Sequence, residues 1–181
     1  FMVLLFVIAG ISARLSLQKR SGKEFLKDRT VKLLVPSTLG LFVFYWILGY
    51  FNIRVGGGWE QMSANVPGFV CYLIAAVSGI GPLWFAQMLW IFSVFLLILK
   101  KLDRNDAISR FFRNTNAWTA LLFIPLIWAS AQILNTPVIT VYRFGIYFTA
   151  YLLGYYVFSH EQIQESLCRY AVPFTATAVL M

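Results

Sequence analysis

The sequence has little charge, because Asp, Glu, Lys and Arg together make up 12% of its 181 residues. A soluble globular domain carries about 25% charged residues, so too little polar surface is present to coat a soluble body of this size. The two cysteines and single histidine exclude a disulfide scaffold and a metal cluster. Apolar residues are abundant instead, at 60%, with 18% aromatics and a mean hydropathy of +0.73. The composition therefore excludes an ordinary cytosolic enzyme, a disordered tail and a nucleic-acid module, and predicts a polytopic membrane protein.

The apolar residues are concentrated in six runs, which are 1–12, 33–51, 83–99, 117–134, 141–158 and a last one from 171 onward. The four complete runs have 17 to 19 residues, and at about 1.5 Å per residue a helix of this length approaches the roughly 30 Å of a hydrocarbon core. Because a spanning segment must satisfy its own backbone polar groups, each run is expected to be a helix. We predict an all-α, polytopic transmembrane helical bundle. It is expected to be a single domain over 1–181, incomplete at both ends.

The segment 66–81 allows two interpretations. Its apolar part, 69–79, is too short to span, and glycine and proline residues bracket it. The segment forms either a short interfacial or re-entrant helix or the upstream extension of the third span. Its length favours the short, non-spanning helix.

The distribution of basic residues predicts the orientation of the chain. Thirteen of the fifteen lysines and arginines fall between runs one and two, three and four, or five and six, whereas Arg54 and Arg143 lie on the other side. By the positive-inside rule the basic side is cytoplasmic. We therefore expect a multi-pass protein of the cell membrane, with the basic loops 13–32 and 100–116 in the cytoplasm. The net charge of +8 is then mainly an orientation signal and a possible surface for anionic lipid or substrate.

The loop between the first two runs also contains the best candidates for a binding site. Arg29 and Lys32 are three residues apart and would share one face of a helix at the membrane boundary. Two such cations can hold phosphate groups, and Arg14 lies at the other membrane edge of the same loop. The plain alternative is a basic loop that only sets the topology.

His160 follows a span end and is expected to be solvated.

Several motifs follow one another in a fixed order along the chain. The residues that carry them are Phe6, Gly10, Arg29, Lys32, Pro36, the stretch GPLWF at 81–85, and Gly154. Together they resemble the membrane-bound acyltransferase family three, whose members acylate sugars, glycan chains and some antibiotics, and especially members that modify periplasmic glucans. Leu5 and Ala9 stand where the family usually has an aromatic residue and a serine, and Lys32 replaces its second arginine.

The resemblance implies an O-acyltransferase that moves an acyl group from acyl-CoA, on the cytoplasmic side, to a hydroxyl of a carbohydrate or similar acceptor. Arg29 and Lys32, with Arg14, are the candidate residues for the phosphates of coenzyme A, although a lysine offers a point charge rather than the fork of an arginine. The general base of the family is a histidine in a preceding helix. The catalytic residue is therefore expected upstream of Phe1, and the chain alone is expected to be inactive.

The expected partners are acyl-CoA as co-substrate, a carbohydrate or glycan acceptor and the lipid bilayer, without nucleic acid, bound cofactor or metal. Trp84, Phe85 and Arg143 are weaker candidates for an acceptor cavity. The two aromatic residues can equally anchor a helix at the interface, and Arg143 can extend to water. The alternative function is a polytopic transporter or flippase without covalent chemistry. The runs contain no ionisable side chain near their centres, which disfavours it. A structural or regulatory membrane subunit is a third possibility.

Overall fold

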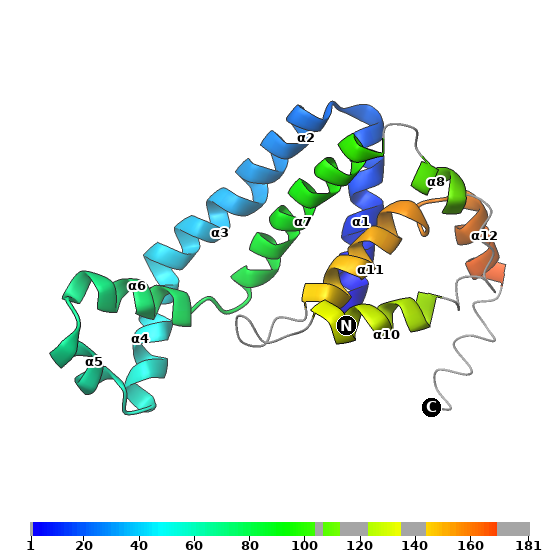
Figure 1. Ribbon diagram of the computed structural model, residues 1–181. Helices are drawn as coiled ribbons and strands as arrows, with labels where there is room; N and C mark the ends of the chain where they lie inside the picture. The colour runs from blue at the N-terminus through cyan, green and yellow to red at the C-terminus, as the bar shows by residue number, and fades with distance from the viewer. Residues whose placement is uncertain (1, 104–106, 113–122, 135–143, 170–181) are drawn as a thin grey trace. The chain divides into compact units, whose positions relative to one another are not determined.

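The computed structural model describes residues 2–103, 107–112, 123–134 and 144–169, and in these residues the chain forms helices and turns without strands (Figure 1). The described chain groups into two compact units. Unit 1 contains residues up to 22 and from 95 onward, and unit 2 contains residues 23–94. The predicted all-α membrane fold is confirmed in the described residues.

The helices in chain order are α1 (Met2–Lys19), α2 (Gly22–Arg29), η1 (Thr30–Leu34), α3 (Val35–Gly40), η2 (Leu41–Tyr45), α4 (Trp46–Val55), α5 (Trp59–Asn65), α6 (Gly68–Ser78), α7 (Leu83–Leu102), α8 (Ala107–Phe112), α10 (Phe123–Leu134), α11 (Phe144–Tyr156) and α12 (Glu161–Arg169). The two η segments are π-helical turns. They lie within one continuous helix of 34 residues from Gly22 to Val55.

Three described helices are long and apolar enough to cross a membrane, namely Met2–Lys19, Gly22–Val55 and Leu83–Leu102. They coincide with the first three predicted runs. α10 and α11 contain 12 and 13 residues and coincide with the described parts of the fourth and fifth runs. The sixth run lies outside the described residues.

The expected loop 13–32 is largely helical, and this corrects the sequence interpretation. α1 continues to Lys19 and the next helix begins at Gly22, so only Arg20 and Ser21 connect them. Lys, Arg and Leu dominate this segment and are all good helix formers. The Asp28–Lys32 ion pair adds a contact between successive turns. The basic residues are therefore carried on helices and not on an irregular loop.

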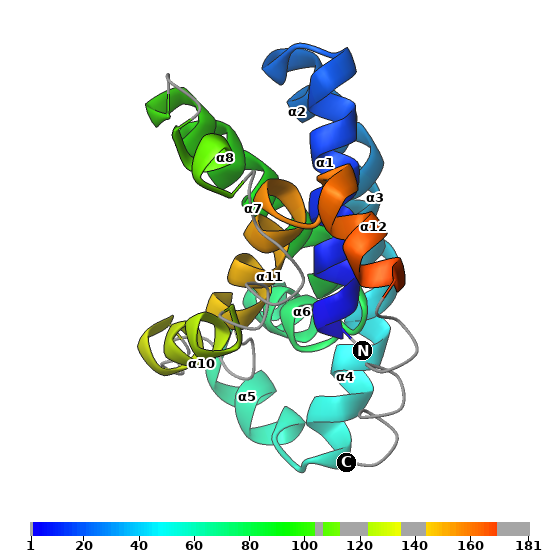
Figure 2. The ribbon, with the colours of Figure 1, turned by 90° about the vertical axis from the view of Figure 1, so that its right-hand side faces the viewer.

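Unit 1 is built on the packing of α1 against α11, which lie side by side in two views (Figures 1 and 2). Phe6 is fully buried, and its ring stacks on that of Tyr147 with centroids 4.9 Å apart. Further along the same contact, a Cβ at Gly10 would overlap the carbonyl oxygen of Tyr151, and one at Gly154 would overlap that of Val7. The two backbones can approach this closely only because both residues are glycine.

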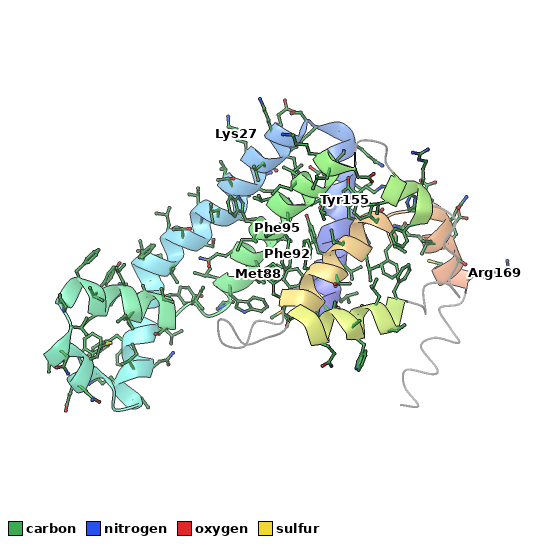
Figure 3. All side chains as sticks on the ribbon, viewed as in Figure 1. Lys27, Met88, Phe92, Phe95, Tyr155 and Arg169 are labelled. Atoms are coloured by element: carbon green, nitrogen blue, oxygen red, sulfur yellow. The ribbon has the colours of Figure 1, made fainter. Side chains whose placement is uncertain are left out.

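The second half of α7 belongs to the same unit. Phe95 of α7, labelled in Figure 3, contacts Phe144 and Phe148 of α11, with ring centroids 6.4 Å and 5.9 Å apart. Leu96, the next residue, is fully buried. This packing sets the position of the basic C-terminal end of α7, with Lys100 and Lys101 in its last turn.

Unit 2 contains the close packing of α4 against α6. A Cβ at Gly49 would overlap the carbonyl oxygen of Ala75, and one at Gly79 would overlap that of Tyr45. The π turn η2 comes directly before α4, and the carbonyl of Phe42 within it accepts a hydrogen bond from the Tyr72 hydroxyl of α6. A backbone carbonyl of the π turn η2 is therefore hydrogen-bonded to a side chain of α6.

The segment 66–81 forms a separate helix and not an extension of the third span. α6 has 11 residues and ends at Ser78, and a turn with Gly81 at φ +44° separates it from α7. At about 1.5 Å per residue, α6 is about 16 Å long, roughly half of a hydrocarbon core. The expectation of a short helix is confirmed, and its length is too small to span.

Candidate functional site

Arg29 and Lys32, the predicted phosphate-binding pair, lie in unit 2 on the helix that begins at Gly22. Each side chain contacts a residue four positions earlier. The Lys32 ammonium lies 2.9 Å from the Asp28 carboxylate, and the Arg29 guanidinium carbon lies 5.2 Å from the Phe25 ring centroid. Both contacts follow from the tilt of helical side chains toward the N-terminus. The carboxylate partner of Lys32 was not predicted.

The π turn η1 begins directly after Arg29 and contains Lys32. The geometry of a regular α-helix, from which the shared face of the pair was predicted, therefore does not apply here. Thr30 anchors this turn: its hydroxyl donates to the Leu26 carbonyl at 2.8 Å and accepts the indole N–H of Trp90 at 2.9 Å. Lys32 is thus carried by a turn that directly follows Arg29 and is tied to α7 within unit 2.

Arg14, the third predicted cation, lies in unit 1. Phe6, Gly10 and Arg14 are four residues apart and follow one face of α1, which is the face that packs on α11. The Arg14 guanidinium donates to the Tyr155 carbonyl at 3.3 Å and lies 5.8 Å from the centroid of the Tyr155 ring. The structure therefore joins Arg14 to the end of α11, in a different unit from Arg29 and Lys32.

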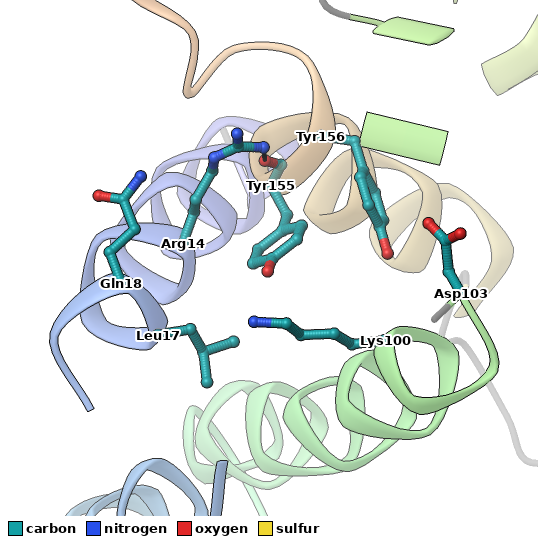
Figure 4. A pocket seen from close by; sticks show the side chains of 7 residues that line it. All are labelled: Arg14, Leu17, Gln18, Lys100, Asp103, Tyr155 and Tyr156. Carbon is teal, nitrogen blue, oxygen red and sulfur yellow. Dashed lines mark hydrogen bonds between the residues drawn. The ribbon is translucent and has the colours of Figure 1, made fainter. Parts of the chain in front are cut away.

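A polar cavity of about 260 Å³ lies beside Arg14 in unit 1 (Figure 4). The residues that line it are Arg14, Leu17, Gln18, Lys100, Asp103, Tyr155 and Tyr156. Lys100 reaches in from the end of α7, with its ammonium directed toward Leu17 and the Tyr155 ring. Asp103 accepts a hydrogen bond from the backbone N–H of Ile108 at 3.1 Å, in the first turn of α8. The cavity thus combines Arg14 of α1 with Lys100 and Asp103 from the C-terminal end of α7.

A second cavity of about 400 Å³ shares Arg14 and Gln18 with the first and extends to the start of α12, where His160 and Glu161 line it. The expectation of a solvated His160 is wrong, since the residue is half-buried and its Nε2 atom is fully buried. The backbone carbonyl of His160 accepts the N–H of Ile163, a residue that is itself fully buried.

The candidates for an acceptor cavity are only partly described. Trp84 and Phe85 lie in the first turn of α7, with their rings edge to face and centroids 6.4 Å apart. Arg143 lies outside the described residues. Unit 2 contains an aromatic-lined cavity of about 180 Å³ whose walls include Trp46, Trp59 and Tyr72. None of the three cavities described here includes Trp84 or Phe85 among its lining residues.

Sequence reasoning missed most of the polar cavity beside Arg14. In the sequence Lys100 is one of the basic residues that predict the orientation, and Tyr155 and Tyr156 directly follow the motif glycine Gly154. The i,i+4 spacing of Phe6, Gly10 and Arg14 was the one available signal, because it places the arginine in line with two buried positions.

The helices and cavities described above define a polytopic, all-α membrane protein with cations close to the ends of apolar helices. The sequence profile of the membrane acyltransferase family three, described as an acyltransferase domain, matches residues 1–181. The chain therefore belongs to this acyltransferase family, as its motifs indicated. Comparisons with curated proteins and with solved structures gave no match.

Proposed function

We propose that the chain forms part of an integral-membrane O-acyltransferase that moves an acyl group from acyl-CoA to a hydroxyl of a carbohydrate or similar acceptor. The match to the acyltransferase family over residues 1–181 carries the proposal. In the reaction the acceptor oxygen bonds to the thioester carbonyl carbon, the carbon–sulfur bond breaks, and the thiol of coenzyme A leaves. A general base takes the hydroxyl proton, because a neutral hydroxyl is a poor nucleophile.

The charge of the donor supports a role for Arg29 and Lys32 in its binding. Coenzyme A carries phosphate groups, and charge-assisted hydrogen bonds to phosphate are stronger than neutral ones. Lys32 is 66% exposed and Asp28 is 33% exposed. An ion pair this open contributes about 0–1 kcal/mol, so a phosphate can displace the carboxylate at little cost. Arg14 is the third proposed contact with the phosphates of the donor.

The sidedness of the reaction follows from the same proposal. The basic ends of α1 and α7 and the segment 22–32 are placed in the cytoplasm, where acyl-CoA is made available. Trp84, Phe85 and Arg143 remain candidates for the acceptor side. The catalytic base is not assigned to a residue of this chain.

The test uses the full-length protein and labelled acyl-CoA. Arg29→Ala is expected to lower acyl transfer at least tenfold, the effect of losing one charge-assisted contact of about 1.5–3 kcal/mol, while membrane insertion is unchanged. The matched control is Lys27→Ala, because Lys27 is an exposed cation of the same helix. Equal transfer by the two variants would remove Arg29 from the donor site. Absence of transfer in the unsubstituted protein with any acyl-CoA would reject the donor itself.

A further inference from the structure

The aromatic cavity of about 180 Å³ lies between α4, α5 and α6, wholly within unit 2. These three helices contact one another, as Figure 1 shows. The lining residues include Trp46, Trp59, Ser63, Gly68, Cys71 and Tyr72. Two tryptophans and one tyrosine therefore form much of its wall, and each of their side chains is half-buried.

Two of the three aromatic rings are held in place by hydrogen bonds inside unit 2. The Trp46 indole N–H donates to the Val43 carbonyl at 3.1 Å. The Tyr72 hydroxyl donates to the Phe42 carbonyl. The ring centroids of Trp46 and Tyr72 lie 5.8 Å apart. The polar atoms of these two side chains are thus bonded to the protein, and the rings provide an apolar wall.

The third ring comes from α5, which is attached to both neighbouring helices. A turn with Gly57 at φ +73°, a conformation that favours glycine, connects α4 to α5. The Trp59 ring meets the Tyr50 ring of α4 edge to face, with centroids 4.5 Å apart. The Cys71 thiol of α6 donates to the Val66 carbonyl at the end of α5, at 3.4 Å. These contacts fix the α5 wall of the cavity.

Two polar groups of α5 can bond to a ligand in this cavity. The Ser63 hydroxyl donates to the Glu60 carbonyl at 3.1 Å, so its oxygen can accept a further hydrogen bond. Among the described residues the indole N–H of Trp59 has no hydrogen-bond acceptor, so it can donate to a ligand. The cavity therefore suits a ligand with an apolar face and polar groups at its edge.

The composition of α5 indicates the phase from which a ligand enters. α5 is short and carries Glu60, Gln61 and Ser63, side chains that belong in water or among headgroups and not in hydrocarbon. It follows Arg54, which the sequence places on the side opposite to the basic loops. With this topology, a water-soluble ligand reaches the cavity from the non-cytoplasmic side.

We propose that this cavity binds one sugar ring of a carbohydrate. A pyranose ring carries C–H groups on its faces, which the electron-rich faces of Trp46, Trp59 and Tyr72 attract, and hydroxyls around its edge. These hydroxyls can donate to Ser63 and accept from Trp59. A fatty acyl chain fits the apolar wall but has no group along its length for either hydrogen bond. That the carbohydrate is the acyl acceptor rests on the proposed function, whereas the binding itself does not.

Saturation-transfer difference NMR on the full-length protein measures this binding without acyl-CoA. The protein is kept in octaethylene glycol monododecyl ether, a detergent without a sugar head group. The probes are methyl β-D-glucoside, methyl β-D-galactoside and methyl N-acetyl-β-D-glucosaminide, with octanoate as the apolar alternative. Irradiation of the aromatic protons should transfer saturation to the ring protons of at least one glycoside. Transfer to octanoate alone, or to none of the probes, would reject the proposal.

Trp59→Ala is expected to weaken glycoside binding by about threefold to tenfold, the size of one aromatic contact. Trp59→Phe keeps an aromatic face and is expected to keep most of the affinity. Phe69→Ala is the matched control, because it removes an exposed aromatic ring of unit 2 that does not line the cavity. The midpoint of thermal unfolding is measured for each variant to separate loss of binding from loss of folding.

Gly68→Leu provides a second variant that does not remove any existing contact. Gly68 lines the cavity, and a Cβ there would have nothing within 4 Å, so the backbone can accept a larger side chain. The leucine should crowd the cavity and lower glycoside binding while the unfolding midpoint stays the same. Loss of binding in this variant or in Trp59→Ala, at an unchanged midpoint, supports the site. Unchanged binding in both variants would overturn it.

Acyl-transfer kinetics then connect the cavity to the proposed function. Trp59→Ala is expected to raise KM for the acceptor about threefold to tenfold and to leave KM for acyl-CoA unchanged. Equal changes in both constants would show that Trp59 does not recognise the acceptor. Glycoside binding without any acyl transfer would reject the proposed function and leave this site intact. Acyl transfer without glycoside binding would have the opposite meaning.

Discussion

At the scale of single residues, two motif glycines allow close packing of α1 on α11. Gly10 and Gly154 are far apart in the sequence, yet each lies at the point where the two helix backbones meet. Phe6, one turn before Gly10, fills the same contact with its ring on Tyr147. The motif positions in α1 thus act through packing, and Arg14 follows one turn later on the same face.

Alanine at Gly10 or Gly154 should therefore destabilise the protein. The added Cβ meets backbone atoms, which cannot move aside as a flexible side chain can; at Gly10 it would also lie 2.9 Å from the Tyr155 nitrogen. We expect a loss of about 1–3 kcal/mol, the usual cost of overpacking, seen as a lower midpoint of thermal unfolding in detergent. Gly68→Ala is the control, because a Cβ there would have nothing within 4 Å. Equal midpoints for Gly10→Ala and Gly68→Ala would refute the close approach.

At the scale of helices, the continuous segment Gly22–Val55 is longer than a membrane requires. Its 34 residues make about 51 Å of helix, against a hydrocarbon core of roughly 30 Å. About 20 Å must lie outside the core, and the charged stretch from Gly22 to Lys32 is the part that water or headgroups would accept. Arg29 and Lys32 therefore lie on a helical extension that is expected near the membrane boundary.

The link between this helix and α7 in unit 2 can be measured with a double-mutant cycle. The Trp90 indole donates to the Thr30 hydroxyl at 2.9 Å, and hydrogen bonds between membrane helices are worth about 0.6 kcal/mol on average and at most about 1.7. We expect the coupling between Thr30→Val and Trp90→Phe to fall in this range when unfolding is followed in detergent. Strictly additive effects of the two substitutions would show that the bond does not stabilise the pair of helices.

The sequence predicts the existence of these helices well but predicts their ends and partners poorly. Apolar composition alone requires helices at 33–51 and 83–99, because a membrane leaves the backbone no other way to satisfy its polar groups. The start of this helix as early as Gly22 was not predicted, since charged residues of this kind are compatible with either a helix or a loop. That Lys100 and Arg14 line the same cavity could not be predicted either, because it depends on how the helices of unit 1 pack.

At the scale of the whole molecule, the proposed function requires that the acyl-CoA donor reach the protein from the cytoplasmic side of the membrane. Arg29, Lys32, Arg14 and Lys100 all belong to the set of basic residues that the positive-inside rule assigns to one side. The phosphate-bearing donor proposed for Arg29, Lys32 and Arg14 is found in the cytoplasm. The charge distribution that orients the chain therefore also supplies the cations of the proposed donor site.

This orientation is tested by thiol labelling of single-cysteine variants, made after Cys71 and Cys168 are replaced by serine. Lys23→Cys and Gln61→Cys are suitable positions, because both side chains are exposed, in α2 and α5. A maleimide that does not cross membranes should label Gln61→Cys in intact cells and Lys23→Cys only after permeabilisation. The proposed topology puts these positions on opposite sides. The reverse pattern would place Arg29 and Lys32 away from cytoplasmic acyl-CoA, and the proposed donor site would have to be abandoned even if acyl transfer itself were observed.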